Sequence, residues 1–392
     1  MEIKREQLYE LLKSAPKPQL HLHLDGSLSY NFIRRSITRM KKTNPERASF
    51  LFSNDGWEPG SHDELRSWLM DLKEKQVGEG NVVEKNSNWR IFDICNQFLQ
   101  TKEDLRDATY ELVTSLHDEH NVNYIEIRFA PVLHTNLGLT ELDAVWSVIN
   151  GFNDAKKELT TKGRLTEGGV ILCLLRSYPV QHAENILKIA QSVDGVLGID
   201  IAGDEKTYSL CIFKDVLVAA KNAGIKITVH AGEGKAEKFP SMLENLQLAL
   251  EIGVNRIGHA LAITSASNQL IQEMCHKGIS VEVCLTANCN HPDKCESFSQ
   301  HPVNFMLSHN IPVAGLNCDN LLLSGNNIVG TPDPTNEYVR ALLDCGVKPQ
   351  DLAAIVANGY SHGFSQNSKQ LADKSISLWT EKYLHELNAL GF

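Results

Sequence analysis

Three features are missing from the sequence, and each absence excludes a class of protein. No run reaches about 18 apolar residues, so no segment is predicted to span a membrane. The first residues are mostly charged and lack the apolar core of a secretory signal. No Cys-x-x-Cys pair occurs, which argues against a thiol redox motif and a zinc ribbon. We therefore expect a cytoplasmic protein.

Positive charge is also scarce. Lysine and arginine number 38 against 48 aspartate and glutamate residues, which gives a formal net charge of −10. The densest basic cluster, residues 39–42, is short and forms no stripe. Because an acidic surface repels nucleic-acid phosphates and anionic lipids, we predict no nucleic-acid and no membrane partner. A small, neutral or weakly charged molecule is the expected ligand, and the oligomeric state stays open.

Nine cysteines are present, so at least one thiol is unpaired. Cys173 and Cys284 lie inside apolar runs. Thiols in such positions are interpreted as small buried hydrophobic groups in a reducing compartment.

The distribution of apolar residues predicts an α/β fold. Hydrophobic residues make up 42% of the 392 residues, enough for a large core. Short β-branched segments alternate with longer helical patterns, as in parallel βαβ units. The expected strands cover residues 20–24, 122–131, 169–176, 195–202, 225–231, 255–260, 279–285 and 311–318. Eight strands favour a closed (β/α)8 TIM barrel. A doubly wound sheet is the alternative, but no Gly-x-Gly-x-x-Gly follows a strand.

Two regions fall outside the eight units and are expected to belong to one domain, residues 1–392. Residues 29–100 follow the first strand and are interpreted as a helical insertion on the face where barrel active sites lie. A lid is a natural role for this insertion, and a peripheral helical decoration is the alternative. Residues 349–392 are expected to form C-terminal helices that pack on the outside of the barrel.

The strongest local pattern is Gln19-Leu-His-Leu-His-Leu-Asp-Gly26. Side chains alternate along a strand, so His21 and His23 share one face. Two imidazoles inside a barrel are costly to bury without a partner, and a bound cation would serve both. A His-x-His pair alone also fits two surface or hydrogen-bonded histidines.

Further polar side chains follow three other predicted strands. His230 ends the fifth strand and precedes Glu233, His259 ends the sixth, and Asp319 follows the eighth. Separately, a core histidine, a helix N-terminal residue and a helix cap would explain His230, His259 and Asp319. Together with the first cluster they gather at the C-terminal ends of the strands, which is the face where barrel chemistry occurs.

These stretches resemble the adenosine/AMP deaminase family of metal-dependent amidohydrolases. The resemblance covers about residues 18–364 and the matching motifs stand in family order. They are His21-Leu-His-Leu-Asp-Gly-Ser27, Tyr124-Ile-Glu-Ile-Arg128, Ile201-Ala-Gly-Asp-Glu205, Val229-His-Ala-Gly-Glu233, Arg256-Ile-Gly-His259, Val281-Glu-Val-Cys284, His301-Pro302 and Leu316-Asn-Cys-Asp319. The resemblance implies a (β/α)8 barrel, one zinc ion per chain and hydrolytic deamination of a 6-aminopurine.

The resemblance also implies a role for each matching residue. Glu233 resembles the acid that protonates purine N1, and His259 resembles the base and electrostatic partner of the water that the metal activates. Asp25 resembles the residue that meets the ribose hydroxyls, and Gly203 the one whose N–H reaches N3. The residues that resemble zinc ligands are His21, His23, His230 and Asp319.

The chemistry of these residue types agrees with that implication. Three neutral imidazoles and a carboxylate form an N/O donor set suited to Zn²⁺, with a position left for water. Zinc lowers the pKa of its bound water towards about 7. Attack at C6 removes the aromaticity of the ring, so we expect a protonated Glu233 at N1. His259 and Asp319 then help to move the proton of the hydroxide to the leaving ammonia.

One position departs from the family pattern. The family usually has two consecutive aspartates where this chain has Asp319-Asn320. The resemblance implies that the second aspartate donates a hydrogen bond to N7, for which an aspartic acid has to be protonated. The amide of Asn320 donates without that requirement. Asn320 is therefore compatible with N7 recognition, although it could loosen specificity.

The preferred purine follows from smaller features. Asp25 and the motif at 201–205 resemble the nucleoside branch, since adenine-deaminating relatives typically have His-Leu-Glu-Gly. We expect conversion of adenosine and 2′-deoxyadenosine to the inosines and ammonia, as in purine salvage. AMP or N6-methyl-AMP is second and adenine third. A nucleotide would need cations near its phosphate, which Lys73, Lys75 and Lys85 of the insertion could provide.

A protein of a different class stays as an alternative: a catalytically weak barrel that acts in binding or signalling. The retention of every proposed ligand, with Glu233 and His259, argues against it. Stoichiometric zinc without turnover of any purine would support it.

Overall fold

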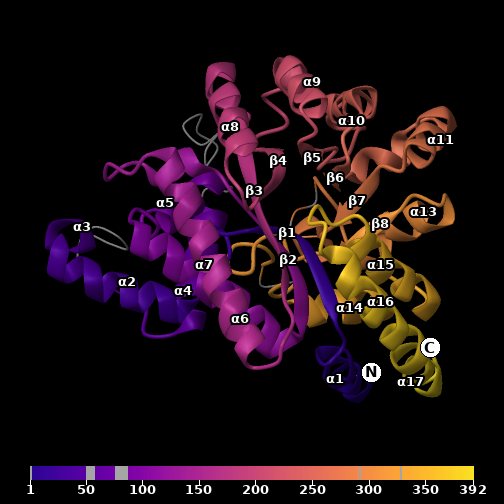
Figure 1. Cartoon of the computed structure of the whole chain (residues 1–392). Helices are drawn as coiled ribbons and strands as arrows, with labels where there is room; N and C mark the ends of the chain where they lie inside the picture. The colour runs from indigo at the N-terminus through magenta and orange to yellow at the C-terminus, as the bar shows by residue number, and fades with distance from the viewer. Residues whose placement is uncertain (1, 50–57, 76–86, 290, 292, 327–328) are drawn as a thin grey trace.

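A computed structural model describes residues 2–49, 58–75, 87–289, 291, 293–326 and 329–392 (Figure 1). Its sheet has eight parallel strands that are neighbours in chain order, β1 to β8. The strands are β1 (Lys17–His23), β2 (Val122–Phe129), β3 (Glu167–Leu175), β4 (Val196–Ala202), β5 (Lys226–Ala231), β6 (Arg256–His259), β7 (Ser280–Val283) and β8 (Val313–Leu316). The predicted (β/α)8 barrel is confirmed.

The barrel closes between its first and last strands. Leu22 of β1 forms a parallel bridge with Asp319, which follows β8. The N–H of His23 donates to the carbonyl of Asp319 at 2.8 Å, and the N–H of Asp319 donates to the carbonyl of His21 at 3.0 Å. Closure therefore brings the predicted histidines of strand 1 next to the predicted aspartate of strand 8.

The strand bounds differ from the predicted ones by a few residues. The eighth strand was expected over 311–318 and ends earlier, at Leu316. Gly315 and Asp319 have φ angles of 78° and 61°. Gly315 still lies within β8, whereas the left-handed backbone at Asp319 departs from the extended conformation of the strand and Asp319 keeps only its bridge to Leu22.

Helices surround the strands (Figure 1). Several of them begin at side-chain caps; for example, Thr101 and Thr140 accept hydrogen bonds from the N–H groups of Asp104 and Asp143. The helices between strands are α6 (Lys102–His120), α7 (Glu141–Thr161), α8 (Val180–Ser192), α9 (Lys214–Asn222), α10 (Ser241–Ile252), α11 (Asn268–Lys277), α12 (Leu285–Asn288) and α13 (Val303–Ser308). Shorter turns of helix are η1 (Pro131–His134), η2 (Leu210–Phe213), η3 (Leu261–Ser265) and η4 (Phe298–Gln300).

Four helices follow β1 in the region of the predicted insertion. They are α2 (Tyr30–Thr43), α3 (Pro45–Ser49), α4 (His62–Lys75) and α5 (Ser87–Asn96). Helix α2 begins at Ser29, which caps it, and buries Phe32 and Ile37. Arg66 of α4 donates to the carbonyls of Leu322 at 2.7 Å and Ser324 at 3.0 Å. The insertion is thereby attached to the loop after β8, on the side of the barrel where the strands end.

The two ends of the chain pack together (Figure 1). The N-terminal helix is α1 (Glu2–Lys13), and the indole of buried Trp379 donates to the carbonyl of Pro16 at 2.7 Å. The C-terminal helices are α14 (Pro334–Leu343), α15 (Pro349–Ser361), α16 (Ser368–Leu378), the π-helical turn η5 (Trp379–Tyr383) and α17 (Leu384–Ala389). Among the described residues, none of the helices has the length and apolar character needed to cross a membrane.

Candidate metal and catalytic site

The polar side chains predicted from the strand ends lie at one end of the barrel. His21 and His23 come from β1, His230 from β5 and His259 from β6, and Asp319 follows β8. All are buried except His23, which is partly exposed. His259 and Asp319 have φ angles of 68° and 61°. A non-glycine residue in this region costs about 1–3 kcal/mol, and such strain clusters at functional sites.

The ligand-type atoms of this cluster face one another. Nε2 of His23 lies 3.3 Å from Nε2 of His230. Oδ1 of Asp319 lies 3.5 Å from Nε2 of both His21 and His23. Ligand atoms of His21, His230, His259 and Asp319 lie within 4.8 Å of one another. The four residues predicted as metal ligands are therefore brought together, and His259 lies beside them.

Two buried carboxylates behind the imidazoles determine which nitrogen faces the centre. Glu282 of β7 lies 2.7 Å from Nδ1 of His21, and Asp200 of β4 lies 3.1 Å from Nδ1 of His230. Because Nδ1–H is the donor in each pair, Nε2 presents a lone pair to the centre. Carboxylate–histidine pairs of this kind orient metal-binding imidazoles.

Arginines compensate the two carboxylates inside the barrel. Arg128 donates to Asp200 at 3.0 Å and to Glu282 at 2.7 Å, and Arg256 donates to Glu282 at 2.6 Å and to Glu126 at 2.5 Å. All five side chains are fully buried. Burial opposes ionisation of Glu282, but Arg128 and Arg256 keep its pKa well below the usual range. Glu282 is thus an ionised acceptor for the proton of His21.

The donor set fits one metal ion. Nε2 of His21 is buried and has no hydrogen-bond partner. Two imidazole nitrogens 3.3 Å apart and a carboxylate oxygen complete the cluster. Converging nitrogen lone pairs and a carboxylate match the ligands that Zn²⁺ prefers.

Glu233, the predicted acid, lies beside this cluster and carries an unexpected partner. Its Oε1 lies 3.6 Å from Nε2 of His259 and forms an ion pair with Lys294. Burial would raise the pKa of Glu233, but the Lys294 ammonium and then His259 outweigh it and lower this pKa to about 2. In the substrate-free protein Glu233 is therefore a carboxylate, whereas its expected role requires the acid form.

A second carboxylate holds the backbone that carries Glu233. Buried Glu205 accepts hydrogen bonds from the N–H of Gly232 at 2.7 Å and from the N–H of Glu233 at 2.9 Å. The amide of Asn245 donates to the same side chain at 3.0 Å. The turn after β5 is thus tied to the loop after β4.

Of the predicted substrate-binding residues, Asp25 directly precedes Gly26 in the chain, and Asn320 lies against Gly26. A Cβ atom on Gly26 would stand 1.7 Å from Oδ1 of Asn320, so only glycine allows this approach. Asp25 is buried, and burial raises its pKa to about 6. Oδ1 of each of these two side chains lacks a hydrogen-bond partner. Unpartnered buried polar atoms of this kind are suited to a polar ligand.

Gly203, the third predicted substrate-binding residue, directly follows β4. Its φ of 111° is accessible to glycine and rarely to other residues. The preceding residue, Ala202, accepts a hydrogen bond from the N–H of Arg176 at 2.9 Å, and the guanidinium of Arg176 donates to the carbonyl of His230 at 2.7 Å. Arg176 thus connects the end of β4 to the histidine of β5.

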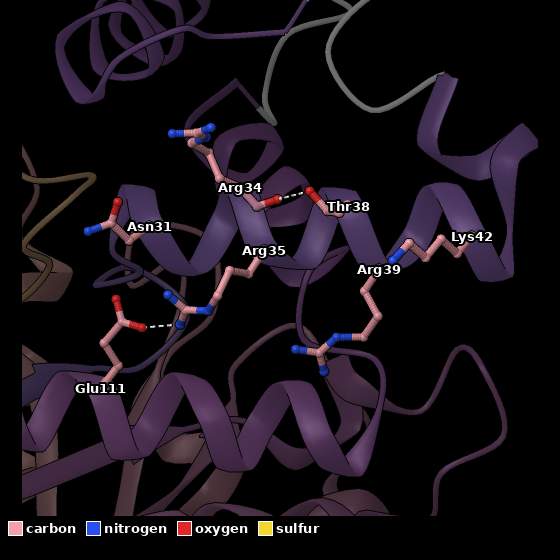
Figure 2. A pocket seen from close by; sticks show the side chains of 7 residues that line it. All are labelled: Asn31, Arg34, Arg35, Thr38, Arg39, Lys42 and Glu111. Carbon is pink, nitrogen blue, oxygen red and sulfur yellow. Dashed lines mark hydrogen bonds and ion pairs between the residues drawn. The ribbon is translucent and has the colours of Figure 1, made fainter.

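The lysines of the insertion that could contact the phosphate of a nucleotide fall where the structure gives no side-chain description. Lys85 and the side chains of Lys73 and Lys75 lie outside the described residues. A separate pocket on α2 (Figure 2) shares no residue with the histidine cluster. Within it Arg35 is paired with Glu111, and Arg39 with acidic groups of α6. Its lining residues are Asn31, Arg34, Arg35, Thr38, Arg39, Lys42 and Glu111.

Several residues of the site were not predicted. Glu282 and Arg128 lie in stretches that carry the family resemblance, and the signal for them was a charged residue inside an apolar strand. Lys294 and Asn288 follow β7 in a stretch rich in polar residues and cysteines. The approach of Lys294 to Glu233 depends on the path of that loop, for which the sequence contains no spacing signal.

Comparisons with known proteins agree with this geometry. The family model for adenosine deaminase matches residues 75–376. An adenosine deaminase of Clostridium botulinum (strain 657 / Type Ba4) is 30% identical over 357 residues, which cover 90% of this chain and 95% of the relative. An adenosine deaminase of Streptococcus agalactiae serotype Ia is 30% identical over 362 residues, covering 92% and 94%.

A solved structure of Arabidopsis ADAL in complex with IMP has a TM-score of 0.75 at 20% identity. The match covers 95% of this chain and 99% of that one. Such low identity supports the fold alone. The family model matches more than half of the chain, and both relatives align with most of it. The chain therefore belongs to the adenosine deaminase family and is a hydrolase that acts on the C–N bond of a cyclic amidine.

Proposed function

We propose that this protein is a zinc-dependent deaminase that converts adenosine and 2′-deoxyadenosine to the corresponding inosines and ammonia, in purine salvage. One observation carries the proposal. The unpartnered Nε2 of His21, the imidazoles of His23 and His230 and the carboxylate of Asp319 converge beside Glu233 and His259. The relatives named adenosine deaminase support the choice of substrate.

The metal would be held by His21, His23, His230 and Asp319. A bound zinc ion supplies Lewis-acid activation of water, whose pKa falls from about 15.7 towards about 7. Glu282 and Asp200 keep the Nδ1 protons of His21 and His230 away from the centre, so that both imidazoles act as ligands.

The purine would bind with C6 towards this cluster. Glu233 protonates N1 as the water oxygen adds to C6, and His259 faces the same oxygen. The N–H of Gly203 donates to N3, and the amide of Asn320 donates to N7. Because Lys294 keeps Glu233 ionised in the substrate-free protein, the Lys294 ammonium has to leave Glu233 when N1 arrives.

The ribose end of the site favours a nucleoside. The unpartnered oxygen of Asp25 can accept a hydrogen bond from a ribose hydroxyl. An ionised carboxylate at this place would repel a nearby phosphate. Arg66, which joins the insertion to the barrel, already donates to two backbone carbonyls, so its guanidinium is engaged within the protein instead of being offered to a phosphate.

Ammonia release from adenosine tests the proposal. Zinc-loaded wild-type protein should release ammonia, and Glu233→Gln should release almost none while it keeps its zinc. Stoichiometric zinc without turnover of adenosine or any related purine would support a binding protein instead.

A further inference from the structure

Three side chains form a buried chain of hydrogen bonds that ends at His259. Asn288 is the last residue of α12, which follows β7, and His301 directly precedes Pro302 at the start of α13. Nδ2 of Asn288 lies 2.9 Å from Nδ1 of His259. Oδ1 of Asn288 lies 3.0 Å from Nε2 of His301. His259 and Asn288 are fully buried, and His301 is 4% exposed.

The direction of each hydrogen bond in this chain follows from a backbone donor. The N–H of Val303 donates to Nδ1 of His301 at 3.1 Å, so Nδ1 carries a lone pair and the proton of His301 is on Nε2. Nε2–H therefore donates to the carbonyl oxygen of Asn288. The Asn288 amide is thereby oriented with its NH₂ towards His259, where it donates to Nδ1. Nδ1 of His259 then carries a lone pair, and the proton of the neutral ring is on Nε2.

We propose that Asn288, oriented by His301, is a positioning residue that fixes His259 as the tautomer with its proton on Nε2, directed at the reacting atoms. The inference rests on the proposed deamination and adds the form in which His259 takes part. Burial lowers the pKa of His301 to about 3, which agrees with a neutral ring at the start of the chain.

The surroundings of Nε2 of His259 agree with a donor. This atom is buried and has no hydrogen-bond partner, and the nearest carboxylate oxygen, Oε1 of Glu233, lies 3.6 Å away. An N–H at this place can donate to an oxygen that adds to purine C6. Oriented donors at developing negative charge are among the largest contributions to catalysis.

A fixed Nε2–H changes the assignment of the base. A ring nitrogen that already carries a proton cannot take one from water, so the first proton of the attacking water goes to a carboxylate oxygen of Asp319. Glu233 takes up a proton from solvent when the substrate separates it from Lys294, and it gives this proton to N1 as the water oxygen bonds to C6. The C6–N6 bond then breaks, and N6 leaves as ammonia with the proton held by Asp319. The proton of the C6 hydroxyl returns to Glu233, so the balance is complete.

The direct test is the tautomer of His259 in the zinc-loaded protein. Nitrogen NMR of protein labelled with ¹⁵N-histidine distinguishes a protonated from an unprotonated ring nitrogen, and the His259 signals are assigned by their loss in His259→Gln. We expect the proton on Nε2 at neutral pH. A proton on Nδ1, or on both nitrogens, would overturn the proposal. This measurement needs no substrate, so it decides the tautomer even if adenosine is not deaminated and the proposed function fails.

Two substitutions connect the tautomer to the reaction. Asn288→Asp keeps size and shape, but its carboxylate accepts from both histidines and moves the proton of His259 to Nδ1. We expect kcat for adenosine to fall ~10²–10³-fold, as for the loss of an oriented donor, with KM unchanged and the ¹⁵N signals reversed. In His301→Gln the side-chain amide can still donate to Asn288, and the loss should be much smaller than in Asn288→Asp.

A control variant distinguishes the effect of the hydrogen-bond chain from the effect of an added negative charge. Asn304→Asp places the same new carboxylate on exposed Asn304 of α13, whose amide donates to the carbonyl of Cys345 at 2.6 Å. Its kcat should stay close to that of the wild type. Wild-type kcat in a folded Asn288→Asp protein would contradict the proposal, as would an equal loss in Asn304→Asp.

Discussion

The ammonium group of Lys294 forms an ion pair with the carboxylate of Glu233 at the centre of the site. Both groups are largely removed from solvent, with side-chain exposures of 29% and 21%. This pair holds Glu233 ionised in the substrate-free protein, although the acid form is the one that can protonate a purine. Lys294 therefore opposes the expected chemistry until a substrate separates the two groups.

Removal of this cation should make the acid form of Glu233 easier to reach. In Lys294→Met the largest pKa-lowering contact of Glu233 is lost, so its pKa rises from about 2. A carboxyl group with a higher pKa is protonated to a greater extent at a given pH, by about ten-fold per unit. We expect kcat/KM for adenosine to rise in Lys294→Met, most clearly on the alkaline side of the pH profile.

Lys294→Arg is the matched control, because it keeps the positive charge and should keep the wild-type pH profile. Zinc content and the thermal midpoint show whether each variant is folded. Loss of activity in a folded, zinc-loaded Lys294→Met protein would mean that the reaction requires the ammonium group.

Glu233→Gln tests the acid itself. The amide is nearly isosteric but has no proton of carboxylic-acid strength to give to N1. We expect kcat to fall ~10²–10⁴-fold, the usual effect of removing a general acid. Zinc content should be unchanged, since Glu233 is not among the expected ligands. Turnover at the wild-type rate would rule out this role.

Glu282→Gln tests the support behind the metal ligands. Glu282 accepts from His21, Arg128 and Arg256 at once, and a glutamine side chain has one acceptor oxygen and no charge. Loss of a partner behind a metal-binding histidine typically costs 10–100-fold in metal affinity, and breaking buried ion pairs costs about 3–5 kcal/mol. Zinc competition against a chelator and denaturant unfolding measure the two effects. Unchanged values in both would show that the carboxylate does not orient His21.

Asn320→Asp tests recognition of N7. Asn320 is buried beside Gly26, and its amide donates weakly to Ser324 at 3.4 Å, so it is available to a ligand. An aspartate donates to N7 only when protonated. We expect Asn320→Asp to keep activity on adenosine at low pH and to lose it as pH rises, relative to the wild type. Complete inactivity at every pH would show that N7 is recognised differently.

The site residues at the strand ends could be predicted because side chains alternate between the two faces of a strand. His21 and His23 alternate with leucines, and His230 ends an apolar strand, so their common face follows from the geometry of a strand. Barrel closure then brings Asp319 to β1. The partners of His21 and His259 could not be predicted in the same way. Glu282 reaches His21 from the seventh strand, 261 residues away in sequence.

The residues that follow β7 show most clearly which part of the site the sequence pattern does not predict. Asn288 and Lys294 belong to a stretch rich in polar residues and cysteines, and such a composition fits a surface loop. Asn288 is fully buried because His259 and His301 take up its hydrogen bonds. Two contacts with residues that are not adjacent to it in sequence therefore determine its environment, and the local sequence pattern contains no information about them.

The most direct test of the proposed function is a comparison of substrates. Purified, zinc-loaded protein is offered adenosine, 2′-deoxyadenosine, AMP, N6-methyl-AMP and adenine separately, and the release of ammonia or methylamine is measured as kcat/KM. The two nucleosides should have the largest values, and Glu233→Gln should abolish them. Inert adenosine together with rapid turnover of AMP, N6-methyl-AMP or adenine would contradict the nucleoside assignment.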